Sequence, residues 1–504
     1  MWRALMFLWA IPGLAAQGRE ESLDAFLESA WKRRDLKPAG PCEDAAFLRR
    51  VSLDLTGSLP APEEVRAFLK SGRKDKRSAK IEELIAGPKS AEYFSYLWTQ
   101  WLMGHDVEDR DVRRLDLGAL SRWLKEAWAK DLPYEEMVTA FLSSSGPLGD
   151  HPPANFLAKH LAPGDPPAVA AGVAARLFLG REIRCAQCHD HPFEDVTQEE
   201  FWSFAAFFRP LRLRDGSLAE EPVSRPAKPR EDLGEIFAEP KFLDGRLPEA
   251  GEPRGRALAR LVLSMEGDVA ARAIVDRVWR LLFGRSIAPG RNSKGDPDLL
   301  RFLVDLFRRH RGSLKGLVRA LVSSRAYQLS SEGPEASRRA FAVGPLKLMN
   351  TVQFLKTWNH ALALDVYYRQ TYEKDPARAP FFRDPDVFWI GQTMHAKELL
   401  FPKGRDPEEV LSSGTDRLAI KLMNNRDLQL LMISQFGLVR RVMKQTEDPG
   451  RRIEELFLLM VSRPPTAREK SRLVEYAKGF VNPYHAYTDV FWMLFNLSEF
   501  IFVG

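Results

Sequence analysis

Apolar residues recur at spacings of three and four along most of the chain, and this periodicity constrains the fold more than any other feature. The stretches 22–32 and 47–55 both follow it. So does 313–323, where the apolar positions of one helix face are Leu314, Leu317, Val318, Leu321 and Val322. Runs that alternate every second residue, as half-buried strands do, are short and few. The sequence therefore predicts a mainly α-helical protein.

Local signals for helix starts agree with the periodicity. Pro62 suits the first turn of a helix, where its missing N–H costs nothing, and two glutamates follow it near the positive end of the helix dipole. The stretches Thr197–Glu200 and Thr466–Glu469 have the spacing of capping boxes, in which each end residue bonds the backbone of the other. A helix is expected to begin at each of these three places.

The length of 504 residues favours more than one domain. The stretch 209–254 is rich in proline, glycine and charge, and we interpret it as a long irregular linker that can hold short strands. The chain is therefore predicted to form two helical domains, at 20–208 and 255–504. A second irregular region covers 365–417, and loops of that length inside a domain are often functional.

The N-terminus has the pattern of a cleaved secretory signal. A short positive start at Arg3 is followed by an apolar stretch at 4–14 and by the small residues Ala15 and Ala16. We predict a signal peptide at 1–16 and a periplasmic or secreted mature protein. The alternatives are a membrane anchor or a buried first helix, but the apolar stretch is too short to span a bilayer. No later run reaches eighteen apolar residues, so no membrane span is expected after cleavage.

The charge balance argues against a nucleic-acid partner. The chain has 74 Lys and Arg against 68 Asp and Glu, which gives a net charge of +6, and the two signs are interspersed. A nucleic-acid binder would be expected to concentrate its positive charge in a block or stripe. We expect no nucleic-acid binding.

The motif that carries chemistry is Cys185-Ala186-Gln187-Cys188-His189. Two cysteines three apart, followed directly by histidine, are typical of covalent c-type haem attachment. The two thiols reach the two vinyl groups of the macrocycle, and the imidazole serves as the proximal ligand of the iron. The motif predicts haem c, with Cys185 and Cys188 as anchors and His189 as the iron ligand. Only three cysteines occur in the whole chain, too few for a disulfide framework.

Three other interpretations of these cysteines stay open. Cys185 and Cys188, with His189 or His191 and with Cys42 brought in by the fold, would form a tetrahedral zinc site. Alternatively, the pair is a redox-active dithiol in an oxidising compartment. In the third alternative the pair forms a structural disulfide beside a packed histidine.

The segment after the motif is aromatic. Five aromatic residues in 201–208 either form apolar walls around a haem or belong to the ordinary core. A second axial ligand would favour electron transfer, whereas an open position would allow small-ligand or peroxidase-like chemistry. By residue type, the candidates for that ligand are Met103, His105, His151, His160, His191, Met394 and His395.

Signatures of hydrolytic enzymes are missing. The sequence contains no Gly-x-Ser-x-Gly elbow, no His-Glu-x-x-His motif and no glycine-rich phosphate loop. Asp54 and Asp276 lie beside apolar helix faces, so each is either a buried acid or a structural carboxylate at a helix end or beside an arginine. Whether the protein is an enzyme is left open at this point.

Several long strings of residues also occur in a known family. The first half resembles the planctomycete-type cytochrome-c-like domain of the second type (PSCyt), and the second half resembles the PSD-type domain that follows it. The strings in the first half are 47–57, 59–64, 123–134 and 178–193, and those in the second half are 272–285, 323–330, 462–466 and 497–500. The segment 295–300 and the region after 341 depart from the pattern of the family.

This resemblance implies an exported bacterial protein of a family whose function is unknown. The relatives occur in bacteria rich in polysaccharide-degrading enzymes, which implies a polysaccharide association as one option. The cytochrome label of the family rests on the same cysteine motif. We therefore expect a cytochrome-c-like redox protein whose partner is another exported cytochrome. The alternative is a structural or glycan-associated module whose Cys/His cluster binds zinc or forms a disulfide.

Overall fold

The computed structural model describes most of the chain. The described residues are 22–104, 109–161, 167–221, 239–289, 295–362 and 437–504, with the single positions 387 and 389. The predicted signal peptide at 1–16 lies outside them, as does nearly all of the irregular region at 365–417.

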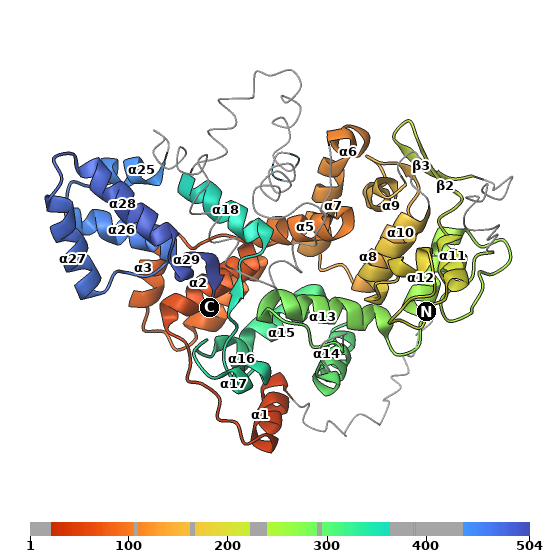
Figure 1. Cartoon of the computed structure of the whole chain (residues 1–504), viewed down its shortest axis with the longest axis horizontal. Coiled ribbons are helices and arrows are strands. Elements are labelled where there is room, and N and C mark those ends of the chain that lie inside the picture. The colour runs from red at the N-terminus through yellow and green to blue at the C-terminus, as the bar shows by residue number, and fades with distance from the viewer. Residues whose placement is uncertain are drawn as a thin grey trace, which may run out of the picture.

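The described part is mainly helical, which confirms the prediction from periodicity (Figure 1). The helices of the first half are α1 (Leu23–Arg33), α2 (Asp44–Thr56), α3 (Pro62–Lys70), α4 (Lys76–Ala86), α5 (Pro88–Met103), α6 (Asp109–Arg114), α7 (Leu117–Ala129), α8 (Tyr134–Ser143), α9 (Asn155–Lys159), α10 (Pro167–Ala174) and α11 (Gln198–Ala205). Three short helical turns accompany them, namely η1 (Pro152–Ala154), η2 (Ala175–Leu179) and η3 (Arg184–Gln187).

The helices of the second half follow the same pattern. They are α12 (Arg254–Leu263), α13 (Val269–Phe283), α14 (Pro297–Arg309), α15 (Leu314–Ser323), α16 (Arg325–Gln328), α17 (Glu335–Arg339), α18 (Thr351–Leu362), α25 (Leu438–Gln445), α26 (Pro449–Val461), α27 (Ala467–Lys478), α28 (Pro483–Phe495) and α29 (Ser498–Ile501). None of the helices in the described ranges is both long and apolar enough to cross a lipid bilayer.

The predicted helix starts are present. Helix α3 begins at Pro62. At α11 the Thr197 hydroxyl accepts the Glu200 N–H at 3.2 Å, and the Glu200 carboxylate accepts the Thr197 N–H at 2.8 Å. The same reciprocal pair forms between Thr466 and Glu469 at α27. Each pair satisfies backbone donors that a helix end otherwise leaves unbonded.

Short strands occur inside the predicted linker. Strands β2 (Leu211–Arg214) and β3 (Ser217–Glu220) form an antiparallel hairpin, and β1 (Gly146–Pro147) pairs with the other edge of β3. The two turn residues, Asp215 and Gly216, have φ values of 49° and 72°. Positive φ at both positions is the geometry of the tight hairpin turn that Asp-Gly favours. A second pair joins β4 (Lys347–Leu348) to β5 (Phe502–Val503) near the end of the chain.

Two apolar cores organise the helices. The larger core includes residues from both sides of the predicted linker, because α12 packs on α8, α13 on η2 and α15 on α4. The smaller core is formed by α18 and by α25–α29, and Figure 1 shows α25–α28 together at one end of the molecule. The predicted domain boundaries stay predictions. The packing shows that the larger core contains residues from both halves of the chain.

A buried polar network joins the halves where the two cores meet. Asp54 in α2 is fully buried. Its carboxylate accepts hydrogen bonds from the Lys347 ammonium at 2.7 Å, the Tyr327 hydroxyl at 2.8 Å and the Gln353 amide at 3.0 Å. Burial lowers the pKa of Lys347, and the adjacent carboxylate opposes that shift. Asp54 is therefore both buried and structural, and its ion-pair partner is Lys347 instead of the arginine that one interpretation of the sequence offered.

Two buried arginines extend this connection from α2. Arg50 donates to the carbonyls of Tyr327 and Leu329, before the start of α17. Arg49 donates to the carbonyls of Glu499 and Phe500 near the C-terminus. Burial lowers the pKa of Arg49 to about 10. Because each guanidinium has carbonyl partners, neither charge is buried without hydrogen bonds.

The second predicted acid, Asp276, stabilises a loop. Its Oδ1 atom accepts the N–H groups of Ile287 at 2.7 Å and Ala288 at 2.9 Å, and the Ser286 hydroxyl donates to both carboxylate oxygens. The carboxylate is half-buried in α13 and closes the turn that follows the helix. Its role is structural, which is one of the two interpretations that the sequence offered for this residue.

Replacing Asp54 with alanine is expected to destabilise the fold strongly. The substitution leaves the Lys347 ammonium buried without its carboxylate, and breaking a buried pair in this way costs about 3–5 kcal/mol. The double variant Asp54→Ala, Lys347→Met removes the unpaired ammonium as well. It is expected to regain part of the free energy of unfolding that Asp54→Ala loses. The free energy of unfolding from urea titrations measures both effects.

The exposed pair Glu126–Lys130 provides the control. Its atoms lie 3.0 Å apart, but both side chains are more than half exposed. Glu126→Ala is therefore expected to change the free energy of unfolding by about 0.5 kcal/mol or less. Equal losses for Asp54→Ala and Glu126→Ala would refute the proposed importance of the buried network.

Candidate functional site

The cysteine motif forms one exposed turn at the surface. A π-helical turn, η2, ends at Gly180 with a φ of 65°, and the 3-10 turn η3 follows. Ile183 and Ala186 are fully buried and fix η3 to the core. The thiols of Cys185 and Cys188 are both exposed and free, and the Cys188 N–H bonds to the Cys185 carbonyl at 3.4 Å. Both sulfur atoms are thus accessible within one turn.

A close approach to α10 holds this turn in place. At Gly172 of α10, a Cβ atom would overlap with the Arg184 side chain of η3. The missing side chain lets the two segments pack directly against each other. The turn is also bonded on its other side, where the Gln187 carbonyl accepts the Trp202 indole N–H and the Gln198 amide, each at 3.2 Å.

His189 is exposed, and one of its two ring nitrogens is engaged. Its Nδ1 lies 2.7 Å from the Asp190 carbonyl oxygen, which can only accept, so Nδ1 carries the proton. No described residue forms a hydrogen bond with its Nε2. In histidines that bind a metal, a hydrogen bond of this kind to the other ring nitrogen fixes the tautomer. The Nε2 atom of His189 is therefore unprotonated, which is the form that can bind a metal.

His191 has a different environment in the same loop. Its Nδ1 accepts the N–H groups of Phe193 at 3.2 Å and Glu194 at 2.8 Å. The backbone N–H of His191 bonds to the Val196 carbonyl at 2.9 Å. An ion pair of 3.0 Å between Arg181 and Glu194 fixes the far side of the loop. The loop is bonded to itself and to the segment before the motif.

The aromatic residues of the following helix belong to the core. Phe201, Phe204, Phe207 and Phe208 are buried, and Trp202 is half-buried with its indole bonded to Gln187. Of the two interpretations of this aromatic segment, the ordinary core is the correct one. These phenylalanines are buried, whereas Cys185 and Cys188 are exposed at the protein surface.

Cys42 lies elsewhere in the molecule. It is buried just before α2, its N–H bonds to the Gln328 carbonyl, and Arg77 approaches its sulfur at 4.0 Å. Figure 1 shows α2 and α11 in different parts of the fold. Within the described ranges, no three His, Cys, Asp or Glu side chains gather closely enough to hold a metal ion. The structure does not assemble the zinc site that includes Cys42.

The candidates for a second axial ligand are scattered. Met103 is buried in the larger core, and the ring of His160 lies 2.7 Å from the Leu102 carbonyl. The His151 ring lies directly against Gly146. Among the candidates, His105, Met394 and His395 lie outside the described residues. The structure places His191 in the motif loop itself and assigns no second ligand.

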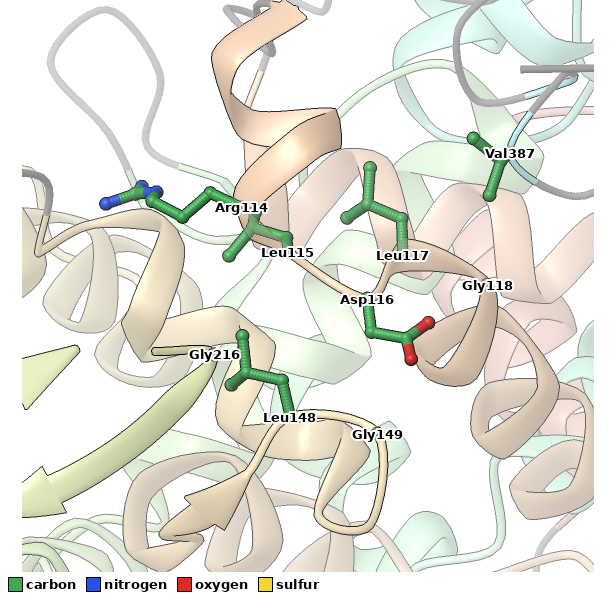
Figure 2. A pocket seen from close by; sticks show the side chains of 9 residues that line it. All are labelled: Arg114, Leu115, Asp116, Leu117, Gly118, Leu148, Gly149, Gly216 and Val387. Atoms are coloured by element: carbon green, nitrogen blue, oxygen red, sulfur yellow. The ribbon is translucent and has the colours of Figure 1, made fainter. Parts of the chain in front are cut away.

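A recess of about 330 Å³ lies apart from the motif (Figure 2). It is lined by the loop before α7, by Gly149 and by the hairpin turn at Gly216. Asp116 faces it but already caps α7, because its Oδ1 accepts the Ala119 N–H at 2.8 Å. Figure 2 shows Arg114 extending away from Asp116, and its guanidinium bonds to the Lys159 carbonyl. The recess therefore lacks a converging set of catalytic groups.

The residues of the motif fit covalent haem attachment. Two accessible thiols lie in one turn, and the next residue presents an imidazole with an available Nε2. This is the donor set that c-type haem requires. The sequence identified these donors but missed the residues that hold them, namely Arg181, Gln198 and Trp202. No spacing rule marks those three, because the folded loop alone brings them to the motif.

Comparison with known families agrees with the resemblance in the sequence. The PSCyt2 model, described as a protein of unknown function (DUF1549), matches residues 22–212. The PSD1 model, described as a protein of unknown function (DUF1553), matches residues 254–351. No curated protein and no solved structure matches the chain. The cysteine motif and Asp54 fall within the first match, and Lys347 and Tyr327 fall within the second.

The buried His160 generates a prediction about pH. Burial lowers its pKa to about 4, well below the value of 6.5 that an unfolded histidine has. The unfolded chain therefore binds the proton more readily between these values, and stability falls as the pH drops through this window. The loss attributable to His160 is about 3 kcal/mol.

The variant His160→Gln tests this origin. A glutamine amide can occupy the position of Nε2 and donate to the Leu102 carbonyl, but it does not titrate. Urea unfolding from neutral pH down to about pH 4 is expected to show a smaller loss of stability in the variant than in the parent. Identical pH dependence in the two proteins would contradict the assignment.

Proposed function

The chain carries a PSCyt2 domain followed by a PSD1 domain, and we propose that it is an exported cytochrome-c-like protein with one covalently attached haem. Cys185 and Cys188 are the anchors, and His189 is the proximal ligand. The N-terminal signal pattern supports a location in the periplasm or outside the cell.

The geometry of the motif turn is the observation that supports this proposal most directly. Ala186 is buried between two exposed cysteines, so the thiols face outward from a turn that is itself fixed. His189 follows with Nδ1 bonded to a carbonyl and Nε2 available. A structural cysteine pair would not need an adjacent imidazole whose Nε2 is available.

The surface position favours electron transfer as the role. When bound, the haem supplies one-electron redox chemistry. The residues of the chain anchor it, orient the imidazole and leave the site open to a partner. We propose that this partner is another exported redox protein, such as a second cytochrome.

The leading alternative is a redox-active dithiol formed by Cys185 and Cys188. Two exposed thiols in a C-x-x-C turn support it, because such pairs form and break disulfides when accessible. The zinc alternative has less support, since Cys42 lies elsewhere in the fold.

Expression in a host that attaches c-type haem tests the function. The intact mass of the exported protein is expected to include one haem that survives denaturation, because the thioether bonds are covalent. Cys185→Ala and Cys188→Ala are each expected to weaken attachment, and the double variant is expected to abolish it. Mass spectrometry under denaturing conditions gives the result.

Cys42→Ala is the matched control, since this thiol is buried away from the motif. It is expected to retain the haem. A parent protein whose mass lacks haem would contradict the proposal. A mass lower by two hydrogen atoms than that of the reduced chain would instead support the disulfide.

A further inference from the structure

The loop that follows the motif contains a histidine, His191, whose ring accepts hydrogen bonds from the backbone. His191 accepts two backbone N–H groups on Nδ1, from Phe193 at 3.2 Å and from Glu194 at 2.8 Å. Since both neighbours are donors, Nδ1 must be unprotonated, and the ring proton lies on Nε2. The ring thus satisfies two adjacent backbone donors in a loop that is largely exposed.

The tautomer of His191 is opposite to that of His189. His189 has its proton on Nδ1, because this atom lies 2.7 Å from a carbonyl oxygen. The carbonyl belongs to Asp190, the residue between the two histidines. Its position is set on one side by the Asp190 carboxylate, which accepts the Gln198 N–H at 2.8 Å at the start of α11. On the other side it is set by the turn that His191 closes.

From these contacts we infer that His191 is a positioning residue for His189 and is neither a metal ligand nor a catalytic group. It accepts the N–H groups of 193 and 194, which holds the chain after Asp190 in a tight turn. That turn keeps the Asp190 carbonyl beside Nδ1 of His189 and so leaves Nε2 as the free ligand atom. This role rests on the proposed function, because a fixed tautomer of His189 matters only if that residue binds the haem iron.

Further contacts make the loop a rigid support. The backbone N–H of His191 bonds to the Val196 carbonyl at 2.9 Å, which closes the loop across its base. Arg181 pairs with Glu194 at 3.0 Å and donates to the Asp195 carbonyl at 3.4 Å. Partners of this kind, beyond the ligand itself, orient ligands and are costly to lose.

Two amide variants separate this role from general stability. In His191→Asn the side-chain oxygen can lie where Nδ1 lies and can accept the same two N–H groups. In His191→Gln the carbonyl group is one bond further out and cannot reproduce that acceptor. Both variants remove the imidazole, so a metal ligand at 191 would be lost equally in both.

The readout is the tautomer of His189 in the full-length protein without haem. Nitrogen-15 NMR of the imidazole, at a pH where the rings are neutral, distinguishes Nδ1–H from Nε2–H. We expect Nδ1–H at His189 and Nε2–H at His191 in the parent protein. His191→Asn should preserve the His189 signature, and His191→Gln should shift it toward a mixture of tautomers. In His191→Gln, the amides of Phe193 and Glu194 should exchange about fivefold faster.

Two results would overturn the inference. One is a protonated Nδ1 on His191 in the parent protein, and the other is an unchanged His189 signature in His191→Gln. Because the NMR measurement needs no haem, it decides this role separately from haem attachment. A failure of attachment in the parent protein would contradict the proposed function and leave the tautomer result valid.

Discussion

The contact between Asp54 and Lys347 is the constraint on which the rest of the structure depends. A fully buried carboxylate and a nearly buried ammonium lie 2.7 Å apart, one from each family match. Neither charge could remain in the core alone, because an unpaired buried ion is too costly. The pair therefore requires both halves of the chain to fold together. Arg49 and Arg50 strengthen this requirement, since they connect α2 to carbonyls of the second half.

The shared core also explains how an exposed motif can be held in a fixed position. The motif turn is attached to buried Ile183 and Ala186, and η2 before it packs on α13 of the second half. Arg277 of α13 donates to the Leu177 carbonyl in η2 at 3.0 Å. Residues of the PSD1 match thus pack against the segment that leads into the cysteine motif. The motif is at the surface, but the residues that hold it in place come from both matched regions.

The helices and the motif could be predicted from the sequence because both depend on near neighbours. Periodicity and capping boxes act over a few residues, and so does the spacing of Cys185, Cys188 and His189. The partner of Asp54 could not be predicted, since Lys347 lies 293 residues away and no local pattern marks it. The role of His191 was also hidden, because it depends on loop closure. Side-chain type alone suggested a ligand.

A pyridine haemochrome spectrum of the protein, exported from a cell that attaches c-type haem, tests directly whether the motif binds haem. We expect the absorption bands of haem c in the parent protein, with the colour retained after denaturation because the attachment is covalent. A colourless protein from the same cells, in which a known c-type cytochrome is coloured, would contradict haem attachment at this motif. The motif would then be assigned to thiol chemistry.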